Sequence, residues 1–215
     1  MDDRQDQISD VPGRPPNFGF SVTRVLQDGD DTFVKAVHEP EGDEAAWLTM
    51  SLIRRGENGL MSVRRQISVS DVPESLLVSA MAAYAVPNGD ADRTDTSRHQ
   101  VRGFIEALAD GQTGDTLDAF IDRVAFALYR STPSGNRERL EELVERRRPR
   151  DGVRYHGIDD LVAEGEFAAV FSCFDADGAH FRACDLFRLE NGKIVEHWDA
   201  IQPVARHTVA HNDEA

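Results

Sequence analysis

Apolar and polar residues alternate along the stretch from residue 18 to residue 68. β-Branched and aromatic residues fill the apolar positions, and the turn signals Asp28-Gly29, Glu41-Gly42 and Asn58-Gly59 interrupt them. This pattern predicts consecutive strands joined by short turns, which is typical of an antiparallel meander. The predicted strands cover residues 18–26, 32–38, 45–54 and 60–68.

A helical period replaces the alternation after residue 70. Asp71 is a candidate N-cap, and an apolar stripe with helical spacing follows it at Leu76, Leu77, Ala80, Met81 and Tyr84. The helix is expected to end before Pro87. Residues 87–94 are polar and rich in turn formers, so we interpret them as a linker, and we expect residues 1–17, with their prolines and charges, to be a disordered lead-in.

The second half begins with helical patterns. Val101, Phe104, Ile105 and Leu108 form one apolar stripe. A second helix is predicted over Leu117, Phe120, Ile121 and Val124, and a third from Asn136 through Leu140, Leu143 and Val144 to the Arg148-Pro149 boundary. Strands return after Pro149, at residues 153–163, 167–174, 181–189 and 193–202, and residues 205–215 form a polar tail.

The two strand blocks share a sequence pattern. Leu26-Gln27-Asp28-Gly29-Asp30 corresponds to Val162-Ala163-Glu164-Gly165-Glu166, and Leu52-Ile53-Arg54 to Leu186-Phe187-Arg188, each followed by an Asn-Gly pair. Several of these matches are turn residues that any meander would share. We hypothesise that the first block is a sheet-only partial repeat whose sheet packs on the second one, giving a monomer with an internal pseudo-dimer; a homodimer is the alternative.

Charge and composition narrow the function classes. The chain has 39 acidic and 24 basic residues, a net charge of −15, which disfavours a nucleic-acid partner. No apolar stretch is long enough to span a membrane, and the polar first residues do not resemble a secretory signal, so we expect a cytoplasmic protein. The only two cysteines, Cys173 and Cys184, do not form a disulfide framework.

The last predicted hairpin carries the candidate chemistry. If Leu189-Glu190-Asn191-Gly192-Lys193 makes a three-residue loop, Asp185 faces His197 and Ala183 faces Asp199. One face then holds Asp185, His197 and Asp199 among the apolar residues Phe181, Phe187, Val195 and Ile201. A two-residue Asn191-Gly192 turn would instead place Asp185 opposite Trp198. We prefer the first register because it leaves a coherent apolar face.

A carboxylate beside an imidazole can fix the imidazole tautomer, and a second, desolvated carboxylate can act as a base. The residue types therefore fit a proton-abstraction site. The strand periodicity alone, however, favours an Asp–His pair that satisfies itself in a sheet and binds nothing. His207 and His211 are four residues apart, but no helical pattern or third ligand accompanies them, and we expect no metal site and no cofactor.

The run from Asp185 to Val204, with the Glu164-Gly165 turn before it, resembles the closing signature of the SnoaL-like polyketide cyclase family, within the nuclear transport factor 2-like superfamily. The resemblance covers the second half of the chain. It implies an α+β cone, in which a curved antiparallel sheet wraps around N-terminal helices, and cofactor-free acid–base chemistry on aldol-type or related small substrates. By position, Asp199 matches the family's acid/base carboxylate, and Asp185 matches a polar residue that lines the pocket.

One departure from the family pattern concerns the stretch after the second predicted helix. Family members commonly carry a Gln-His-Asn-Pro run there, whereas this chain has Tyr129-Arg130-Ser131-Thr132-Pro133. Tyr129 and Arg130 are therefore candidate substrate-binding residues in place of the missing donors. The departure favours a non-catalytic ligand-binding or protein-interaction module on the same fold, while the intact His197-Trp198-Asp199 run favours catalysis.

The sequence thus predicts an α+β chain with a meander and helix at residues 18–86, a linker at 87–94 and a SnoaL-like domain at 95–204. The predicted activity is cyclisation or isomerisation of a small hydrophobic or hydroxylated molecule, with Asp199 as acid or base and His197 and Asp185 as its partners. Hydrolysis of an epoxide by an activated water is a second enzymatic alternative.

Overall fold

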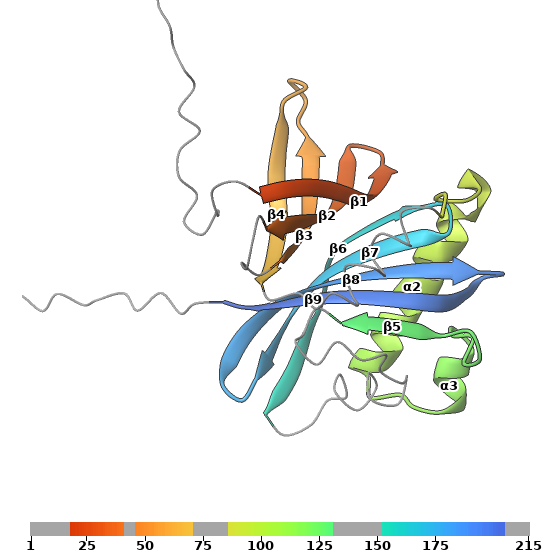
Figure 1. The fold of residues 1–215 in the computed structure, drawn as a ribbon. Helices are drawn as coiled ribbons and strands as arrows, with labels where there is room; N and C mark the ends of the chain where they lie inside the picture. The colour runs from red at the N-terminus through yellow and green to blue at the C-terminus, as the bar shows by residue number, and fades with distance from the viewer. Residues whose placement is uncertain (1–17, 41–45, 71–85, 131–151, 205–215) are drawn as a thin grey trace, which may run out of the picture.

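We describe the fold from a computed structural model of the chain, which defines residues 18–40, 46–70, 86–130 and 152–204 (Figure 1). The predicted lead-in, the helix after Asp71, the helix from Asn136 and the polar tail lie outside these residues. None of the described helices is long and apolar enough to cross a membrane.

The first half forms a four-stranded antiparallel sheet. Its strands are β1 (Phe18–Asp28), β2 (Asp31–Pro40), β3 (Trp47–Arg55) and β4 (Met61–Ser70), and they pair in sequence order. The predicted meander is confirmed because short turns leave each strand beside its predecessor. At the β1–β2 turn, Gly29 has a φ of 60°, a conformation that suits glycine.

The second half forms a five-stranded sheet in the order β5-β9-β8-β7-β6. It comprises β5 (Ala127–Arg130), β6 (Val153–Glu164), β7 (Phe167–Ala176), β8 (Ala179–Glu190) and β9 (Lys193–Pro203). β6 to β9 are antiparallel neighbours, and β5 joins the edge parallel to β9. Before them come the 3₁₀ turn η1 (Ala91–Arg93), α2 (Thr94–Ala109) and the short α3 (Asp115–Asp118).

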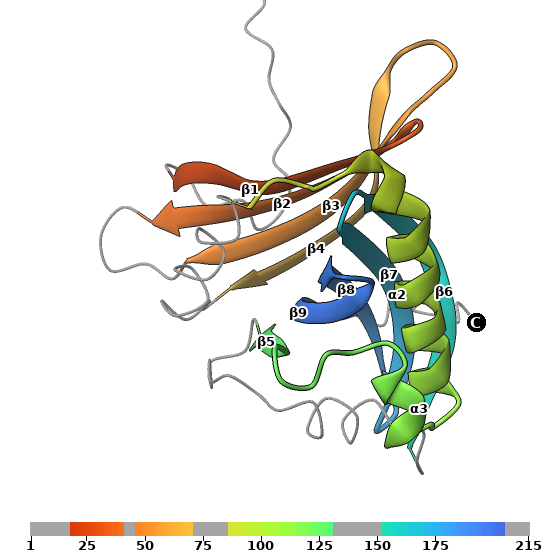
Figure 2. The same ribbon diagram turned by 90° about the vertical axis from the view of Figure 1, so that its right-hand side faces the viewer.

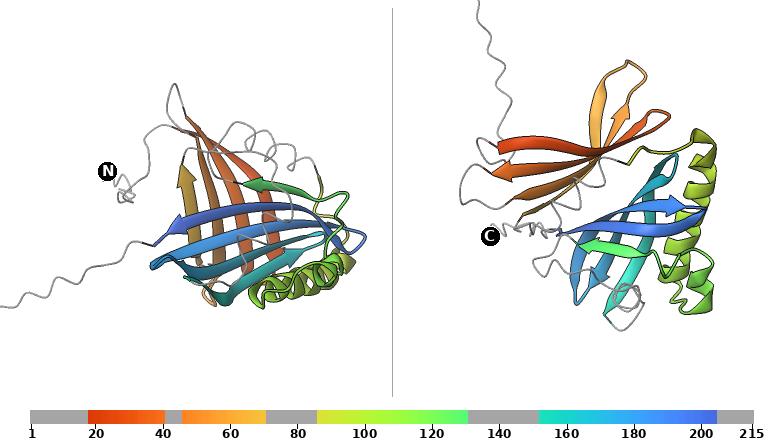
Figure 3. Two further views of the ribbon diagram at one scale, coloured as in Figure 1. Left: turned by 90° about the horizontal axis from the view of Figure 1, so that it is seen from below. Right: turned by 45° about the vertical axis from the view of Figure 1, so that its right-hand side comes forward.

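Each face of the second sheet has its own cover. On one face, α2 buries the predicted stripe Val101, Phe104, Ile105 and Leu108 (Figure 2). On the other face lies the first sheet, whose strands cross those of the second (Figure 3). Phe33 of β2 meets Phe171 of β7 edge to face, with ring centres 6.2 Å apart. The buried middle of the second sheet is therefore shielded from water on both faces within one chain.

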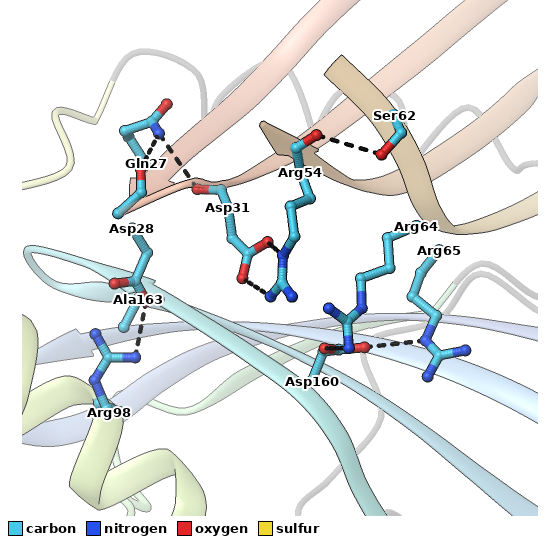
Figure 4. Close-up of polar contacts among 11 residues, drawn as sticks. Gln27, Asp28, Asp31, Arg54, Ser62, Arg64, Arg65, Arg98, Asp160 and Ala163 are labelled. Atoms are coloured by element: carbon cyan, nitrogen blue, oxygen red, sulfur yellow. Dashed lines mark hydrogen bonds and ion pairs between the residues drawn. The ribbon is translucent and has the colours of Figure 1, made fainter. Parts of the chain in front are cut away.

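Hydrogen bonds and ion pairs connect the first sheet to the second sheet and to α2 at the edges of their interface (Figure 4). Asp160 on β6 accepts a hydrogen bond from Arg65 at 3.0 Å and forms an ion pair with Arg64 at 3.3 Å; both arginines are on β4. Asp28, at the end of β1, accepts from Arg98 of α2 at 2.8 Å and from the backbone N–H of Ala163 at 3.1 Å. The first sheet is thus tied to α2 as well as to the second sheet.

The second predicted helix is wrong beyond Asp118. The chain leaves α3 and pairs with β9: the Asp122 N–H donates to the Ile194 carbonyl at 3.1 Å, and the Ile194 N–H donates to the Phe120 carbonyl at 2.8 Å. The Asp122 side chain accepts from the N–H groups of Val124 and Ala125, which makes a turn where the helix was expected. Val124, assigned to the apolar stripe, is 95% exposed. Strand β5, which follows, was not predicted.

The predicted repeat has a topological counterpart. β1 to β4 and β6 to β9 are both four-stranded antiparallel meanders. Gly29 and Gly165 occupy the same place in their first hairpins, with φ values of 60° and 58°. A common origin of the two sheets stays a hypothesis.

Candidate functional site

The β8–β9 hairpin differs from both registers considered for it. The turn has two residues, Asn191 and Gly192, with φ values of 52° and 76°, and Glu190 pairs with Lys193. A β-bulge then adds one residue to β9 between the partners of Arg188 and Leu189. Asp185 consequently lies opposite Asp199, and Phe187 lies opposite His197. The predicted register is therefore wrong by two residues.

Beyond the bulge, a shift of two residues leaves the side chains on their predicted face, whereas Ile194, before the bulge, packs on the α2 face instead of the opposite one. Asp185, His197 and Asp199 do share one face of the second sheet, and Trp198 projects to the opposite face, into the core between the sheets. The three polar side chains are buried, with exposed fractions of 0%, 1% and 1%. They lie on the face that α2 partly covers.

Asp185 and His197 form a direct pair. His197 Nε2 lies 2.8 Å from Asp185 Oδ1, and both groups are shielded from water. An ionised Asp185 accepts a hydrogen bond from Nε2–H, which leaves the lone pair of the neutral ring on Nδ1. His197 Nδ1 is buried and has no hydrogen-bond partner in the part of the chain that the structure describes. A buried acceptor without a donor is costly, so this atom is suited to a donor supplied from outside the chain.

Phe187 fixes the plane of the imidazole. The two rings are stacked with centres 4.5 Å apart and planes 7° apart. Phe187 in turn meets Phe104 of α2 edge to face at 5.8 Å. Phe104 of α2 therefore packs against the phenyl ring of Phe187, and this ring covers one face of the His197 imidazole.

Asp199 stands between two strands. Its backbone pairs with Asp185 on β8 and with Arg130 on β5. The side chains of Tyr129 and Arg130 are outside the described part of the structure, as are residues 131–133. Their predicted role in substrate binding stays a prediction, although the parallel β5–β9 pairing brings their backbone beside the Trp198-Asp199 pair.

Aromatic side chains extend the site along the same face. Phe181 stacks on Phe174 at 5.2 Å, and Phe174 stacks on Tyr155 at 6.3 Å. The Tyr155 hydroxyl donates to Ser172 Oγ at 2.6 Å. Sequence reasoning missed Tyr155, Phe174 and Ser172, although the strand alternation that selected Phe181 would also have placed them on this face. Val195 is buried and Ile201 is partly exposed.

Two clefts lie near this layer without containing the three polar residues. One is a shallow depression between the end of α2 and β6, too small to enclose a water molecule, and is lined by Ile105, Leu108, Ala109 and Tyr155. The other has room for about one water molecule, lies between the two sheets and is lined by residues that include Arg65, Phe171 and Arg182. The first belongs to the face that carries Asp185 and His197, and the second to the opposite face.

Comparison with known proteins gives one family match. Residues 101–197 match the model of the SnoaL-like domain. No curated protein matches the chain. Solved structures that resemble it include a nuclear transport factor 2-like protein from Mesorhizobium loti, at 20% identity, with a TM-score of 0.46 and coverage of 53% of this chain and 96% of that one.

Two further solved structures are similar in the same sense. A nuclear transport factor 2-like protein from Cytophaga hutchinsonii is 21% identical, with a TM-score of 0.40 and coverage of 49% of this chain and 89% of that one. An LEH-like epoxide hydrolase from M. tuberculosis is 21% identical, with a TM-score of 0.40 and coverage of 51% of this chain and 85% of that one. The family match lies inside the predicted domain and includes the Asp185–His197 pair, so the resemblance of the C-terminal half of this chain to the SnoaL-like family is confirmed.

Proposed function

We propose that the SnoaL-like domain binds a small hydrophobic or hydroxylated molecule and catalyses its aldol-type cyclisation or isomerisation by acid–base chemistry without a cofactor. The observation that carries the proposal is the buried Asp185–His197 pair, whose second imidazole nitrogen has no hydrogen-bond partner among the described residues. A pair that served only the fold would leave no buried acceptor open.

In the proposed reaction, Asp185 holds the proton of His197 on Nε2 and stabilises the imidazolium that forms when Nδ1 accepts a second proton. The substrate is a carbonyl compound with an acidic C–H bond beside the carbonyl. His197 Nδ1 or the Asp199 carboxylate removes that proton and leaves an enolate. In an isomerisation the proton returns to another carbon, and in a cyclisation the enolate carbon attacks a second carbonyl, whose oxygen takes the proton.

Asp199 is the second acid or base in this scheme. Asp185 and Asp199 are directly opposed on adjacent strands, and two buried negative charges at that spacing repel one another. His197 compensates the charge on Asp185. Proton transfer among the three groups would keep the site close to neutral while a substrate proton is moved.

We assign substrate contact to the apolar residues around the polar three: Phe181, Phe187, Val195 and Ile201, with Tyr129 and Arg130 contributed from β5. Phe187 already covers one face of His197, so a flat substrate would lie along the edge of the ring. We expect the protein to act in the cytoplasm as a single copy.

The alternative is a ligand-binding or protein-interaction module without catalysis. It is supported by the two clefts described above, neither of which is lined by Asp185, His197 or Asp199. The two functions differ in one respect: catalysis needs a substrate within hydrogen-bonding distance of His197 or Asp199, whereas a binding module needs only the apolar surface.

Mass spectrometry of ligands that copurify with the native chain tests the proposal, followed by turnover assays on the compound found. Asp199→Asn and His197→Gln should each lower turnover by about 10²–10⁴-fold, the usual contribution of a positioned acid or base. Asp95→Asn is the matched control, because the Asp95 side chain is 99% exposed. Binding that persists with equal turnover in all variants would favour the binding module.

A further inference from the structure

A second group of titratable side chains lies on the opposite face of the second sheet. His156 on β6, Asp175 on β7 and His180 on β8 come from three adjacent strands. His156 Nε2 is 2.8 Å from Asp175 Oδ2, and His180 Nδ1 is 2.7 Å from Asp175 Oδ1. The three ligand atoms all lie within 4.8 Å of one another.

Strand geometry explains why these residues meet. Asp175 and His180 are direct cross-strand partners. Asp175 is four residues beyond Phe171, and His180 is four residues before Cys184, so both share the face of those core residues. Tyr155 packs on the other face, and its neighbour His156 therefore points to this one.

A β-bulge brings His156 into place. The β6–β7 register shifts between Tyr155 and Ile158, and Gly157, inside the shift, has a φ of 105°, which is open to glycine but not to other residues. Bulges commonly re-aim a side chain next to a functional site. Here the bulge turns an edge-strand imidazole toward the carboxylate of the neighbouring strand.

The ligand set is that of a transition-metal site. Two imidazole nitrogens and a carboxylate oxygen bind Zn²⁺ and related divalent ions, which sit about 2.0–2.2 Å from each ligand atom. Ligand atoms around such an ion are about 3–4 Å apart. The two hydrogen-bonded contacts to Asp175, at 2.7 and 2.8 Å, would therefore lengthen slightly, and the widest separation, at most 4.8 Å, would shorten. The side chains are 31%, 44% and 41% exposed in chain order, which leaves room for water to complete the coordination shell.

The charges around the cluster are mixed. Asp175 is held ionised, because hydrogen bonds from His180 and then His156 lower its pKa. Arg154 pairs with Asp175 in the strand register, and Arg182 lies two residues from His180; both oppose a cation, while the net charge of −15 attracts one. The thiol of Cys173, two residues away, lies 3.9 Å from Asp159 Oδ1 and is not part of the cluster.

We propose that His156, Asp175 and His180 bind one divalent transition-metal ion of the zinc class, with water in the remaining coordination positions. The site is separate from the Asp185–His197 pair, which lies on the other face of the sheet. By joining β6, β7 and β8 near their ends, the ion would also stabilise that end of the sheet.

The test is Zn²⁺ titration of the untagged full-length chain by isothermal calorimetry, with Co²⁺ absorption in the visible range as a second readout. We expect one ion per chain and a higher melting temperature with Zn²⁺. His180→Gln and His156→Gln should each weaken binding by at least about tenfold, since losing even an outer partner of a ligand costs about 10–100-fold. Both side chains are partly exposed, so the variants should fold.

Two controls separate this site from general binding to histidines. His99→Gln removes an exposed histidine on α2 and should leave the affinity unchanged. The paired change His207→Gln and His211→Gln removes the two histidines of the C-terminal segment and should also leave one tight ion per chain. Absence of saturable Zn²⁺ binding, or equal binding by the wild type and His180→Gln, would overturn the proposal.

Discussion

The amino group of Lys35 lies 4.9 Å above the centre of the Trp198 ring, in the layer between the two sheets. Lys35 is 1% exposed, and its Nζ has no hydrogen-bond partner among the residues that the structure defines. The indole face offers a cation some compensation but much less than water does. Burial first, and then the charge of Arg24, lower the pKa of Lys35 from 10.5 to about 7.

This pKa makes stability depend on pH. In the unfolded chain Lys35 keeps its ordinary pKa, so between about pH 7 and 10.5 the unfolded state binds more protons than the folded state. The free energy of unfolding therefore rises with pH across that window and is lowest below it. The shift corresponds to on the order of 5 kcal/mol over the whole window.

Lys35→Met should remove this dependence. The variant keeps the apolar volume without the charge, so at pH 7 it should be more stable than the wild type by at least about 1–2 kcal/mol. The difference should shrink toward pH 10. Urea unfolding of both proteins from pH 6 to pH 10 measures this difference in the free energy of unfolding. A difference that stays constant with pH would contradict the lowered pKa of Lys35.

The chain has only two lysines, Lys35 and Lys193, which permits a direct check. Lys193 Nζ donates to the carbonyls of Asp118 and Ala119 at 2.7 Å and is the internal reference. NMR of the lysine side chains should show one signal that titrates near pH 7, and that signal should be missing from Lys35→Met.

Gly165 is predicted to tolerate no side chain. A Cβ atom there would collide with the backbone carbonyl of Asn88, whose oxygen also accepts the Glu166 N–H at 2.6 Å. Gly165 donates to Thr94 Oγ1 at 2.9 Å and accepts from Ser97 Oγ at 2.8 Å, so linker, turn and helix start are packed together. The turn cannot shift without breaking these bonds.

Gly29→Ala is a matched control for Gly165→Ala. The φ values are 60° and 58°, but a Cβ at Gly29 would meet nothing within 4 Å. Each substitution should cost about 1–2 kcal/mol for the left-handed backbone. Gly165→Ala should cost at least about 1 kcal/mol more, because the Asn88 contact adds overpacking strain. Equal melting temperatures of Gly165→Ala and Gly29→Ala would show that the backbone around Asn88 moves without cost to make room for the added Cβ.

The strands and their faces could be predicted from the sequence because side-chain direction repeats every two residues. An error of two in the β8–β9 register therefore left Asp185, His197 and Asp199 on one face. The same rule places Lys35 inward, since it stands between Phe33 and Val37 on β2. Its charge did not override the strand pattern.

Bulges and the segment after α3 could not be predicted. A bulge inserts one residue with no distinctive composition, so the meeting of His156 with Asp175 leaves no spacing motif in the sequence. After Asp118 the apolar residues fit a helix, but tertiary pairing with Ile194 and the Asp122 turn override that propensity.

The ion pair between the sheets should contribute measurably to stability. The Asp160 side chain is 10% exposed and is bonded to Arg65 and Arg64, which are themselves 35% and 39% exposed. Asp160→Asn should lower the free energy of unfolding by about 1–2 kcal/mol, since one partner is shielded while the other two are screened by water.

Salt gives the control for that measurement. High salt should reduce the difference between the wild type and Asp160→Asn, because it screens the exposed arginines. Gln66→Ala is a matched surface change on β4, the strand that carries Arg64 and Arg65. Gln66 is exposed, and within the described part of the chain its side chain donates a hydrogen bond to the neighbouring Ser68. If both variants lowered the free energy of unfolding by the same small amount, the ion pair would contribute no more to stability than an ordinary surface residue.

The packing of the two sheets predicts a monomer. Phe33, Leu48 and Met50 of the first sheet cover Phe171, Leu186 and Trp198 of the second, and all six are buried within one chain. A second copy could reach this face only by displacing the first sheet and exposing that apolar surface, which costs about 25 cal/mol per Å². Light scattering at moderate salt should therefore give 23.9 kDa at every concentration.

The tip of the β3–β4 hairpin provides a control for association through a surface other than the face between the sheets. Met61 and Val63 on β4 are 52% and 60% exposed, and contacts between such tips could mimic dimerisation. Met61→Ser with Val63→Ser removes them without touching the covered face. A stable dimer that survives this change, with amides of β7 to β9 protected by a second copy, would show that the first sheet does not replace a partner subunit.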